Sequence, residues 1–328
     1  MSYRITQKQN VWSGRVDPSG DKNTLYWHQV VQLVSLDDLP AAQGEQIAFL
    51  GYKSDEGVRR NKGRVGAKDG PDEIRKSMAK FAVHFDSESI ELVDVGNITT
   101  DGEDLESSQS ELAEAINSLL QKGYRSILLG GGHEIAYGHY TGIRKYVGDQ
   151  VLGIINLDTH FDLRAYPDGP HSGSPFRQVL DDCLKSGDEF HYLPIGISQS
   201  GNQKVLFEVH HQAGQQYIDE RAIDSNHLEP VFEQIQLFAD QLDHIYLTLD
   251  LDVISAAHAP GVSAPAAFGL EPVIVRQLIR KVFDTGKVIS FDIAELNPKY
   301  DDGRTAKLAA SFIYDVMMSC YKHHSIRN

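Results

Sequence analysis

The chain has 328 residues, of which 41% are hydrophobic and 23% are charged, and its formal net charge at pH 7 is -15. That length and composition are ordinary for a globular protein with a sizeable core. The negative charge disfavours nucleic acid and anionic membrane surfaces as partners, because the electrostatic part of the binding free energy would be repulsive.

The N-terminal segment lacks the apolar stretch of a secretory signal. Residues 1–20 are polar, and no window has the roughly 18 apolar residues of a membrane span. Two cysteines, Cys183 and Cys320, are too few for a disulfide framework or a thiolate metal site. We therefore expect a cytoplasmic protein with a small-molecule substrate, and the lack of a linker predicts one domain over residues 1–328.

Strand-like and helix-like segments alternate along the chain. Runs rich in β-branched and aliphatic residues predict strands at residues 47–51, 90–95, 126–129, 151–157, 192–197, 245–249 and 288–291. Helical periodicity marks residues 71–79, 108–120, 134–146, 228–242, 271–283 and 305–321. This alternation predicts an α/β fold with parallel strands, because each crossover needs a helix to bring the chain back.

Acids and histidines follow four of the predicted strands. They occur at residues 130–134 (GGGHE), 158–162 (DTHFD), 250–252 (DLD) and 292–295 (DIAE). In an open parallel sheet, functional groups gather beyond the carboxyl ends of the strands. We therefore expect these four segments to meet at one edge of the sheet.

The spacing within these segments indicates metal binding. Residues two apart in an extended segment point the same way, so Asp158, His160 and Asp162 can act together, as can Asp250 and Asp252. A lone Asp-x-Asp or His-Glu is usually a solvated loop end or a helix cap, whereas Asp-x-His-x-Asp is a stronger signal of metal binding. Carboxylates at four strand ends would repel one another unless cations neutralise them, which predicts more than one metal ion. Manganese suits the carboxylate and imidazole ligands, although iron, cobalt and zinc also fit.

These motifs resemble those of the ureohydrolase family, which contains arginases, agmatinases and formimidoylglutamases. The resemblance covers residues 51–297 and implies a single-domain three-layer αβα sandwich with a mainly parallel eight-stranded sheet. It implies two Mn²⁺ ions per chain, one held by His133, Asp158, Asp162 and Asp250, the other by Asp158, His160, Asp250 and Asp252. With Asp158 and Asp250 bridging, the ions would lie about 3.5–4 Å apart and activate a bridging hydroxide as nucleophile.

Within the family, the chain is most similar to the formimidoylglutamases, which hydrolyse N-formimidoyl-L-glutamate to L-glutamate and formamide in histidine degradation. Residues 132–134 read GHE, whereas arginases and agmatinases usually have Asp before that His and Ser after it. Four further stretches are similar to the formimidoylglutamase versions, namely residues 12–15 (WSGR), 55–61 (DEGVRRN), 160–164 (HFDLR) and 172–178 (SGSPFRQ).

The substrate would carry two carboxylates, so its pocket should offer cations or forked donors. Candidates beside the motifs are Arg59, Arg60, Asn61, Arg64, Arg164 and Arg177, of which we expect one or two to touch substrate. The resemblance implies that Glu295 holds the amidine, that Asp252 passes on a proton and that His171 protonates the leaving nitrogen. Residues 170–172 (PHS) depart from the His-Gly usual in arginases, which puts the role of His171 in doubt.

Three alternatives stay open at this stage. The chain could hydrolyse another guanidino or amidino compound, as agmatinases or guanidinobutyrases do, and acids in place of the arginines would then be expected in the tail pocket. It could be a binding protein without activity, although all six ligand positions are filled, or a deacetylase with a single zinc ion. The resemblance also leaves a homo-oligomer open.

Overall fold

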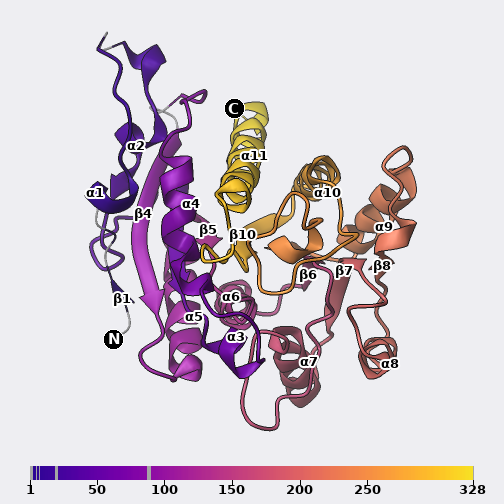
Figure 1. Ribbon diagram of the computed structural model, residues 1–328. Coiled ribbons are helices and arrows are strands. Elements are labelled where there is room, and N and C mark those ends of the chain that lie inside the picture. Colours follow the sequence, from indigo (N-terminus) through magenta and orange to yellow (C-terminus); the bar gives the residue numbers. More distant parts are fainter. Residues whose placement is uncertain (1–2, 5, 7, 19–20, 87–89, 328) are drawn as a thin grey trace.

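A sheet of ten strands runs through the computed structural model, which describes residues 3–4, 6, 8–18, 21–86 and 90–327 (Figure 1). Its long strands each overlap one of the predicted runs: β3 (Glu45–Lys53), β4 (Ile90–Thr99), β5 (Arg125–Leu129), β6 (Leu152–Leu157), β7 (His191–Ile197), β9 (His244–Asp250) and β10 (Val288–Ala294). The other strands have two residues each: β1 (Tyr3–Arg4), β2 (Gln32–Leu33) and β8 (Ile218–Asp219).

The strands lie in the order β1-β4-β3-β5-β10-β9-β6-β7-β8, and β2 also pairs with β4. Every pairing is parallel except that of β1 with β4. The predicted α/β class and mainly parallel sheet are confirmed. The expected eight strands correspond to the path from β4 to β8, and β1 and β2 are additional because N-terminal segments pair with the outer side of β4.

Helices cover both faces of the sheet (Figure 1). One layer contains α4 (Gly70–Met78), α9 (Glu229–Asp240), α10 (Pro272–Asp284) and α11 (Arg304–Arg327). The other contains α5 (Leu105–Gln121), α6 (Ile135–Val147), α7 (Pro175–Ser186) and α8 (Lys204–Gln212). The short helices are α1 (Lys8–Val11), α2 (Trp27–Val30) and α3 (Glu56–Arg60), and single 3₁₀ turns occur at Lys22–Thr24, Ala67–Asp69, Glu220–Ala222 and Leu251–Val253.

Helices α7 and α8 were not among the predicted helices. Helix α7 starts with Pro175, and its buried residues Phe176, Val179, Leu180 and Cys183 recur at helical spacing. Gly187, with a φ of 82°, follows the last turn. With 12 and nine residues, both helices are near the length at which packing rather than local propensity decides stability.

Two hydrophobic clusters, one on each face, fix the sheet between the helix layers. Along β3, Ile47 and Phe49 point into one cluster, whereas Ala48 and Leu50 point into the other. This burial on both faces explains why the strands read as near-continuous apolar runs. Among the described residues, no helix is long and apolar enough to cross a membrane.

Candidate active site

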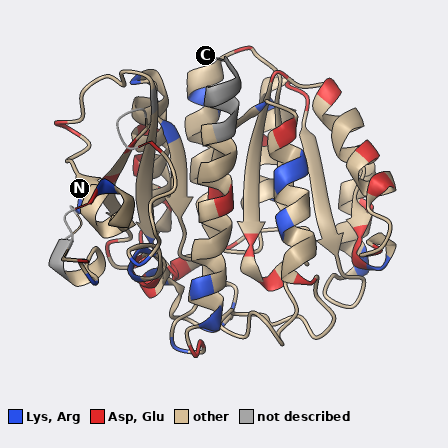
Figure 2. Ribbon diagram, turned by 90° about the horizontal axis from the view of Figure 1, so that it is seen from above, with Lys and Arg blue, Asp and Glu red and all other residues tan. Residues whose placement is uncertain are grey.

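Four adjacent strands, β5, β10, β9 and β6, end at one edge of the sheet. Their last residues are in register, since Ile293 pairs with Leu129, Ala294 with Asp250, and Leu157 with Leu249. The acid-rich segments that follow these strands therefore leave the sheet side by side. Figure 2 shows Asp and Glu in red just beyond the arrowheads of the central strands.

Two groups of potential metal ligands overlap at this edge. His133, Asp158 and Asp250 form one, and Asp158, His160 and Asp252 form the other; the ligand atoms of each group lie within 4.8 Å of one another. Asp162 joins them, with its Oδ2 3.0 Å from His133 Nδ1. The structure thus brings together all six side chains that the sequence analysis proposed as ligands.

Local hydrogen bonds shape the two acidic turns. The backbone N–H of His160 donates to Asp158 Oδ1 at 2.7 Å, and that of Asp252 donates to Asp250 Oδ1 at 2.8 Å. In both turns, a short polar side chain bonds the backbone two residues on. Each carboxylate is oriented by its own segment, and its second oxygen faces the cluster.

Backbone strain is concentrated here as well. Among the described residues, positive φ outside glycine occurs at Lys62, at Asp162 (φ 48°) and at Glu295 (φ 69°). Residues in such sparsely populated conformations cluster at functional sites, where the surrounding structure enforces them. The N–H of Glu295 donates to Gly131 O at 2.8 Å, and Glu295 Oε1 accepts from the N–H of His133 at 2.9 Å. The loop after β10 is thereby joined to the loop after β5.

The cluster is strongly anionic and buried. His133 Nδ1 lies 3.1 Å from Asp158 Oδ2 and 3.2 Å from Asp250 Oδ2. Burial alone would lower the pKa of His133, but the surrounding carboxylates outweigh it and raise that pKa well above its usual range. Burial, followed by the charges of Asp252 and Asp158, raises the pKa of Asp250 well above normal, and burial raises that of Asp252 to about 6.

Several buried polar atoms of the cluster have no aligned hydrogen-bond partner. They are His133 Nδ1, Asp252 Oδ1 and Glu295 Oε2. Carboxylate oxygens surround His133 Nδ1 at hydrogen-bond distance, yet none is aligned with an N–H direction. Such atoms are costly to bury without a partner. A pair of divalent cations fits this donor set, which contains carboxylates and imidazoles and no thiolate.

Glu134 is a site residue to which the sequence analysis gave no role. Its Oε1 accepts from Ser54 Oγ at 3.1 Å and from the N–H of Gly57 at 3.0 Å, and a Cβ added at Gly57 would lie 2.5 Å from Glu134 Cδ. Burial, with some help from neighbouring acids, raises the pKa of Glu134 to about 7; burial and the charge of Glu134 raise that of Glu295 to about 8. Glu134 thus connects the turn that carries His133 with the segment leading into α3.

His171 is not in hydrogen-bond contact with the acidic cluster. Its Nδ1 accepts from the N–H of Gly173 at 3.2 Å, and its Nε2 lies 3.3 Å from Ala165 O. Burial lowers its pKa. In this conformation both ring nitrogens are directed at backbone groups, so its role in proton transfer stays a prediction.

Four of the predicted substrate-binding arginines are engaged within the protein. Arg59 and Arg60 both pair with Glu56, at 2.6 and 2.9 Å. Arg60 also pairs with Glu106, at 2.9 Å. Their guanidinium groups are therefore committed to the carboxylates beside α3.

The other two engaged arginines lie further along the chain. Arg64 donates to Ser263 O and Val262 O, both at 2.8 Å, and Arg177 pairs with Asp181 at 2.8 Å within α7. Both arginines are thus bound to neighbouring groups of the protein, and their contact with substrate stays a prediction.

Arg164 and Asn61 are placed differently. A Cβ added at Gly173 would lie 2.9 Å from Arg164 Cδ and 3.0 Å from Asn61 Nδ2, so both side chains pack against this glycine. Asn61 Nδ2 donates to Ser172 Oγ at 3.1 Å. Among the six predicted side chains, all within the described part of the chain, Arg164 is the one that has no ion pair or side-chain hydrogen bond.

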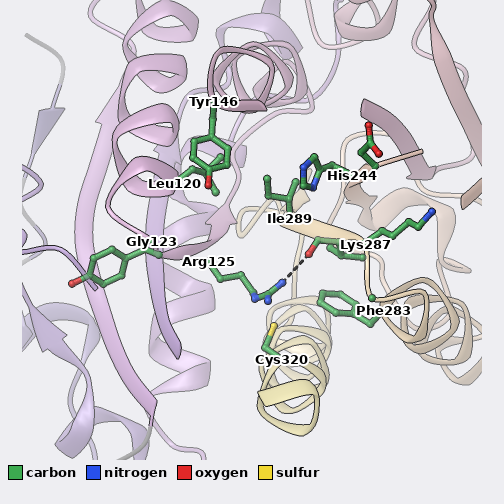
Figure 3. A pocket seen from close by; sticks show the side chains of 13 residues that line it. Leu120, Gly123, Arg125, Tyr146, His244, Phe283, Lys287, Ile289 and Cys320 are labelled. Atoms are coloured by element: carbon green, nitrogen blue, oxygen red, sulfur yellow. Dashed lines mark hydrogen bonds between the residues drawn. The ribbon is translucent and has the colours of Figure 1, made fainter. Parts of the chain in front are cut away.

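A pocket of about 330 Å³ lies at the opposite, amino-terminal edge of the sheet (Figure 3). Its basic groups bond backbone carbonyls: Arg125 Nη1 donates to Val288 O at 2.7 Å, and Lys287 Nζ donates to Ala239 O at 2.8 Å and to Leu242 O at 2.7 Å. None of the predicted site residues lines this pocket. Arg125 and Lys287 therefore provide hydrogen bonds to carbonyl groups of neighbouring segments.

Comparison with known proteins relates this arrangement to one family. The model of the arginase family matches residues 45–319. The chain is 42% identical over 322 residues to a formimidoylglutamase of Geobacillus sp. (strain WCH70), covering 98% of this chain and 97% of that one. A formiminoglutamase of Trypanosoma cruzi, solved with Mn²⁺, is similar with a TM-score of 0.77 at 25% identity, covering 88% and 98% of the two chains. A formimidoylglutamase of Bacillus subtilis has the same fold, with a TM-score of 0.76 at 23% identity over 93% and 96%.

Proposed function

This chain belongs to the arginase family, and we propose that it is a formimidoylglutamase that converts N-formimidoyl-L-glutamate and water into L-glutamate and formamide. The observation that carries the proposal is the overlap of two ligand groups at one sheet edge, with Asp158 common to both. The near full-length similarity to formimidoylglutamases supports the choice of substrate.

Two divalent ions, with manganese as the best fit, complete the site in this proposal. His133, Asp158, Asp162 and Asp250 would hold one, and Asp158, His160, Asp250 and Asp252 would hold the other. When bound, such a pair supplies Lewis-acid activation of water near neutral pH. The similar Trypanosoma cruzi structure contains Mn²⁺, which supports this choice of metal.

The surrounding residues orient the substrate for attack. The second oxygen of Glu295 has no partner in the protein, so it is available to accept a hydrogen bond from the amidine N–H₂ group. Asp252 also has a buried oxygen without a partner, and it accepts the proton released as the water oxygen bonds to the formimidoyl carbon. The carbon becomes tetrahedral, and its bond to the glutamate nitrogen then breaks.

The departing nitrogen needs a proton, because an amide anion is a poor leaving group. His171 is the proposed donor, and it would have to turn its imidazole away from Ala165 O to reach the leaving nitrogen. A ring held by two weak contacts of 3.2 and 3.3 Å can turn at small cost. Proton transfer to nitrogen releases glutamate and leaves formamide.

Arg164 is the proposed partner of a substrate carboxylate. The Arg164 side chain belongs to a partly buried residue, has no hydrogen-bond or ion-pair partner among the described residues, and packs against Gly173, close to His171. A charged hydrogen bond from such a group contributes about 1.5–3 kcal/mol. Asn61, on the same glycine, supplies a second donor.

We further propose that the chain acts as one domain. A single sheet receives strands from β1 to β10, so no described segment forms a separate sheet.

A substrate panel tests the proposed function. The chain is stripped of metal with a chelator, reloaded with Mn²⁺ and incubated separately with formimidoylglutamate, agmatine, arginine and guanidinobutyrate, while formamide, glutamate and urea are quantified by mass spectrometry. We expect turnover of formimidoylglutamate alone, lost in a parallel preparation of Asp252→Asn. Turnover of a guanidino compound in place of formimidoylglutamate would refute the substrate and keep the metal chemistry.

A further inference from the structure

A buried chain of hydrogen bonds begins at the side of the His133 ring that lies opposite the acidic cluster. His133 Nε2 lies 3.0 Å from Thr248 Oγ1. The Thr248 hydroxyl donates in turn to Asp292 Oδ1 at 2.6 Å. Thr248 is fully buried on β9, and Asp292 is fully buried on β10.

The register of the sheet explains this contact. Asp292 pairs with Thr248 across β10 and β9, so the two side chains lie next to each other on one face. Asp292 Oδ2 also accepts from Tyr246 OH and lies 2.5 Å from His139 Nδ1. Two hydroxyl donors and a ring nitrogen of His139 therefore converge on one carboxylate that is shielded from water.

The number of protons available determines the direction of each hydrogen bond between His133 and Asp292. The Thr248 hydroxyl has a single proton, and it donates that proton to Asp292. The hydroxyl oxygen can then only accept from His133, which places a proton on Nε2. An imidazole protonated on Nε2 presents the Nδ1 lone pair to the other side, where Asp158, Asp162 and Asp250 lie.

Packing restricts the same ring. The ring centroids of Phe176 and His133 lie 5.5 Å apart, in an edge-to-face arrangement. Behind the network, the His139 ring contacts the Tyr246 ring with centroids 4.3 Å apart. Rotating His133 would break its bond to Thr248 and leave a buried hydroxyl oxygen without its donor.

We infer that Thr248 and Asp292 are positioning residues that fix the tautomer and the ring orientation of His133, so that Nδ1 binds the metal held by His133, Asp158, Asp162 and Asp250. The inference rests on the proposed two-metal function. Outer partners of this kind typically change metal affinity by about 10–100-fold when they are removed.

Mn²⁺ titration of the metal-free chain tests this inference. Calorimetry compares the wild type with Thr248→Val, which keeps the branched shape and removes the hydroxyl, and with Thr248→Ser, which keeps the hydroxyl. We expect two binding events in the wild type and in Thr248→Ser, and one event weakened by about 10–100-fold in Thr248→Val. The electron paramagnetic resonance signal of a coupled Mn²⁺ pair should decline in parallel, at metal concentrations that saturate the wild type.

The outcomes separate the two proposals. If the wild type binds no Mn²⁺, the proposed function fails and this inference fails with it. If the wild type and Thr248→Val bind two ions equally well, the proposed function stands and the positioning role is wrong. Circular dichroism checks that the valine variant folds; if it does not, Thr248→Ala replaces it, with the same loss expected and the same reading of an unchanged affinity.

Discussion

Two buried polar clusters of this molecule differ in whether all of their polar atoms have hydrogen-bond partners. In the first, which we call the β4 cluster, Arg75 donates to both carboxylate oxygens of Asp94, at 2.9 and 3.0 Å, and to Asn97 Oδ1 at 2.7 Å. Trp12 Nε1 and Thr6 Oγ1 donate to the same carboxylate. The buried charges of Arg75 and Asp94 face each other, with the partly exposed Asp72 3.7 Å from Arg75, and no atom of the cluster's side chains is among the buried polar atoms without a partner in the described structure.

The cluster at the carboxyl edge is the opposite case. Its acids outnumber its cations, and His133 Nδ1 and Asp252 Oδ1 are buried without an aligned partner. Burial of charge is thus common to a structural cluster and a functional one. An excess of one sign, together with unsatisfied atoms, distinguishes the site that is built for a ligand.

Replacing one acid by its amide at the carboxyl edge should give the largest effect, which is a loss of catalytic efficiency. For Asp250→Asn, we expect kcat/KM to fall by about 10³–10⁴-fold, because stabilisation of developing charge by bound metal contributes several kcal/mol. The metal-free variant should be no less stable than the wild type, since the change relieves repulsion from Asp252 and Asp158. Steady-state kinetics and urea unfolding after chelation measure the two effects. The exposed Asp284→Asn is the matched control, and a large loss of metal-free stability in Asp250→Asn would break the comparison.

The same acid-to-amide change in the β4 cluster should act on stability instead. Asp94→Asn removes the close, buried counter-ion of the fully buried Arg75 and leaves it only Asp72, 3.7 Å away, which costs about 3–5 kcal/mol of unfolding free energy. Under conditions where the variant is folded, its Mn²⁺ affinity should equal that of the wild type. Urea unfolding and calorimetry measure both quantities. A variant that loses Mn²⁺ affinity while keeping its stability would show that the two clusters are not separate in function.

An unpaired cation outside both clusters should give an intermediate effect. Arg164→Ala should raise KM for formimidoylglutamate by roughly 10–100-fold with little change in kcat, because a charged hydrogen bond to a carboxylate contributes about 1.5–3 kcal/mol. Arg177→Ala, which removes an arginine paired with Asp181, is the control and should leave KM unchanged. Equal KM values for the wild type and Arg164→Ala would remove Arg164 from the substrate pocket.

The smallest effect concerns a buried atom that lacks a partner and belongs to neither cluster. His210 packs against the rings of Phe161, Tyr192 and Tyr217, its Nε2 has no partner, and burial lowers its pKa to about 4. The unfolded chain binds a proton near pH 6.5 and the folded chain does not, so stability is complete above pH 6.5 and is lost as the pH falls towards 4. His210→Leu should reduce the loss between pH 7.5 and pH 5 by roughly 1–2 kcal/mol, measured by urea unfolding of the metal-free chain. Parallel pH profiles of the two proteins would contradict the assigned cause.

The sequence predicted the site better than it predicted the contacts around it. Parallel strands share one carboxyl edge, so Asp158 and Asp250 were expected at the same edge, and the adjacency of β6 and β9 brings them together. Glu56 lies within one helical turn of Arg59 and Arg60, but their other partners could not be predicted in this way, because Glu103 and Glu106 come from a segment more than 40 residues away.

The network behind His133 shows the same limit. The alternation of Tyr246, Thr248 and Asp250 places three polar side chains on one face of β9, a signal that is visible in the sequence. The contact of Thr248 with Asp292, however, depends on the register between β9 and β10. The two-residue strands escaped prediction for the same reason, since pairing with a distant strand, and not local composition, defines them.

The left-handed backbone at Glu295 limits how the thermal stability of this protein can be increased without loss of activity. A residue with a side chain loses about 1–2 kcal/mol in that conformation, whereas glycine does not. Directed evolution that selects for heat resistance alone would therefore favour glycine at the position that we propose binds the amidine. A screen for heat-stable variants must therefore select for turnover in the same round, because it would otherwise enrich variants that are stable but inactive.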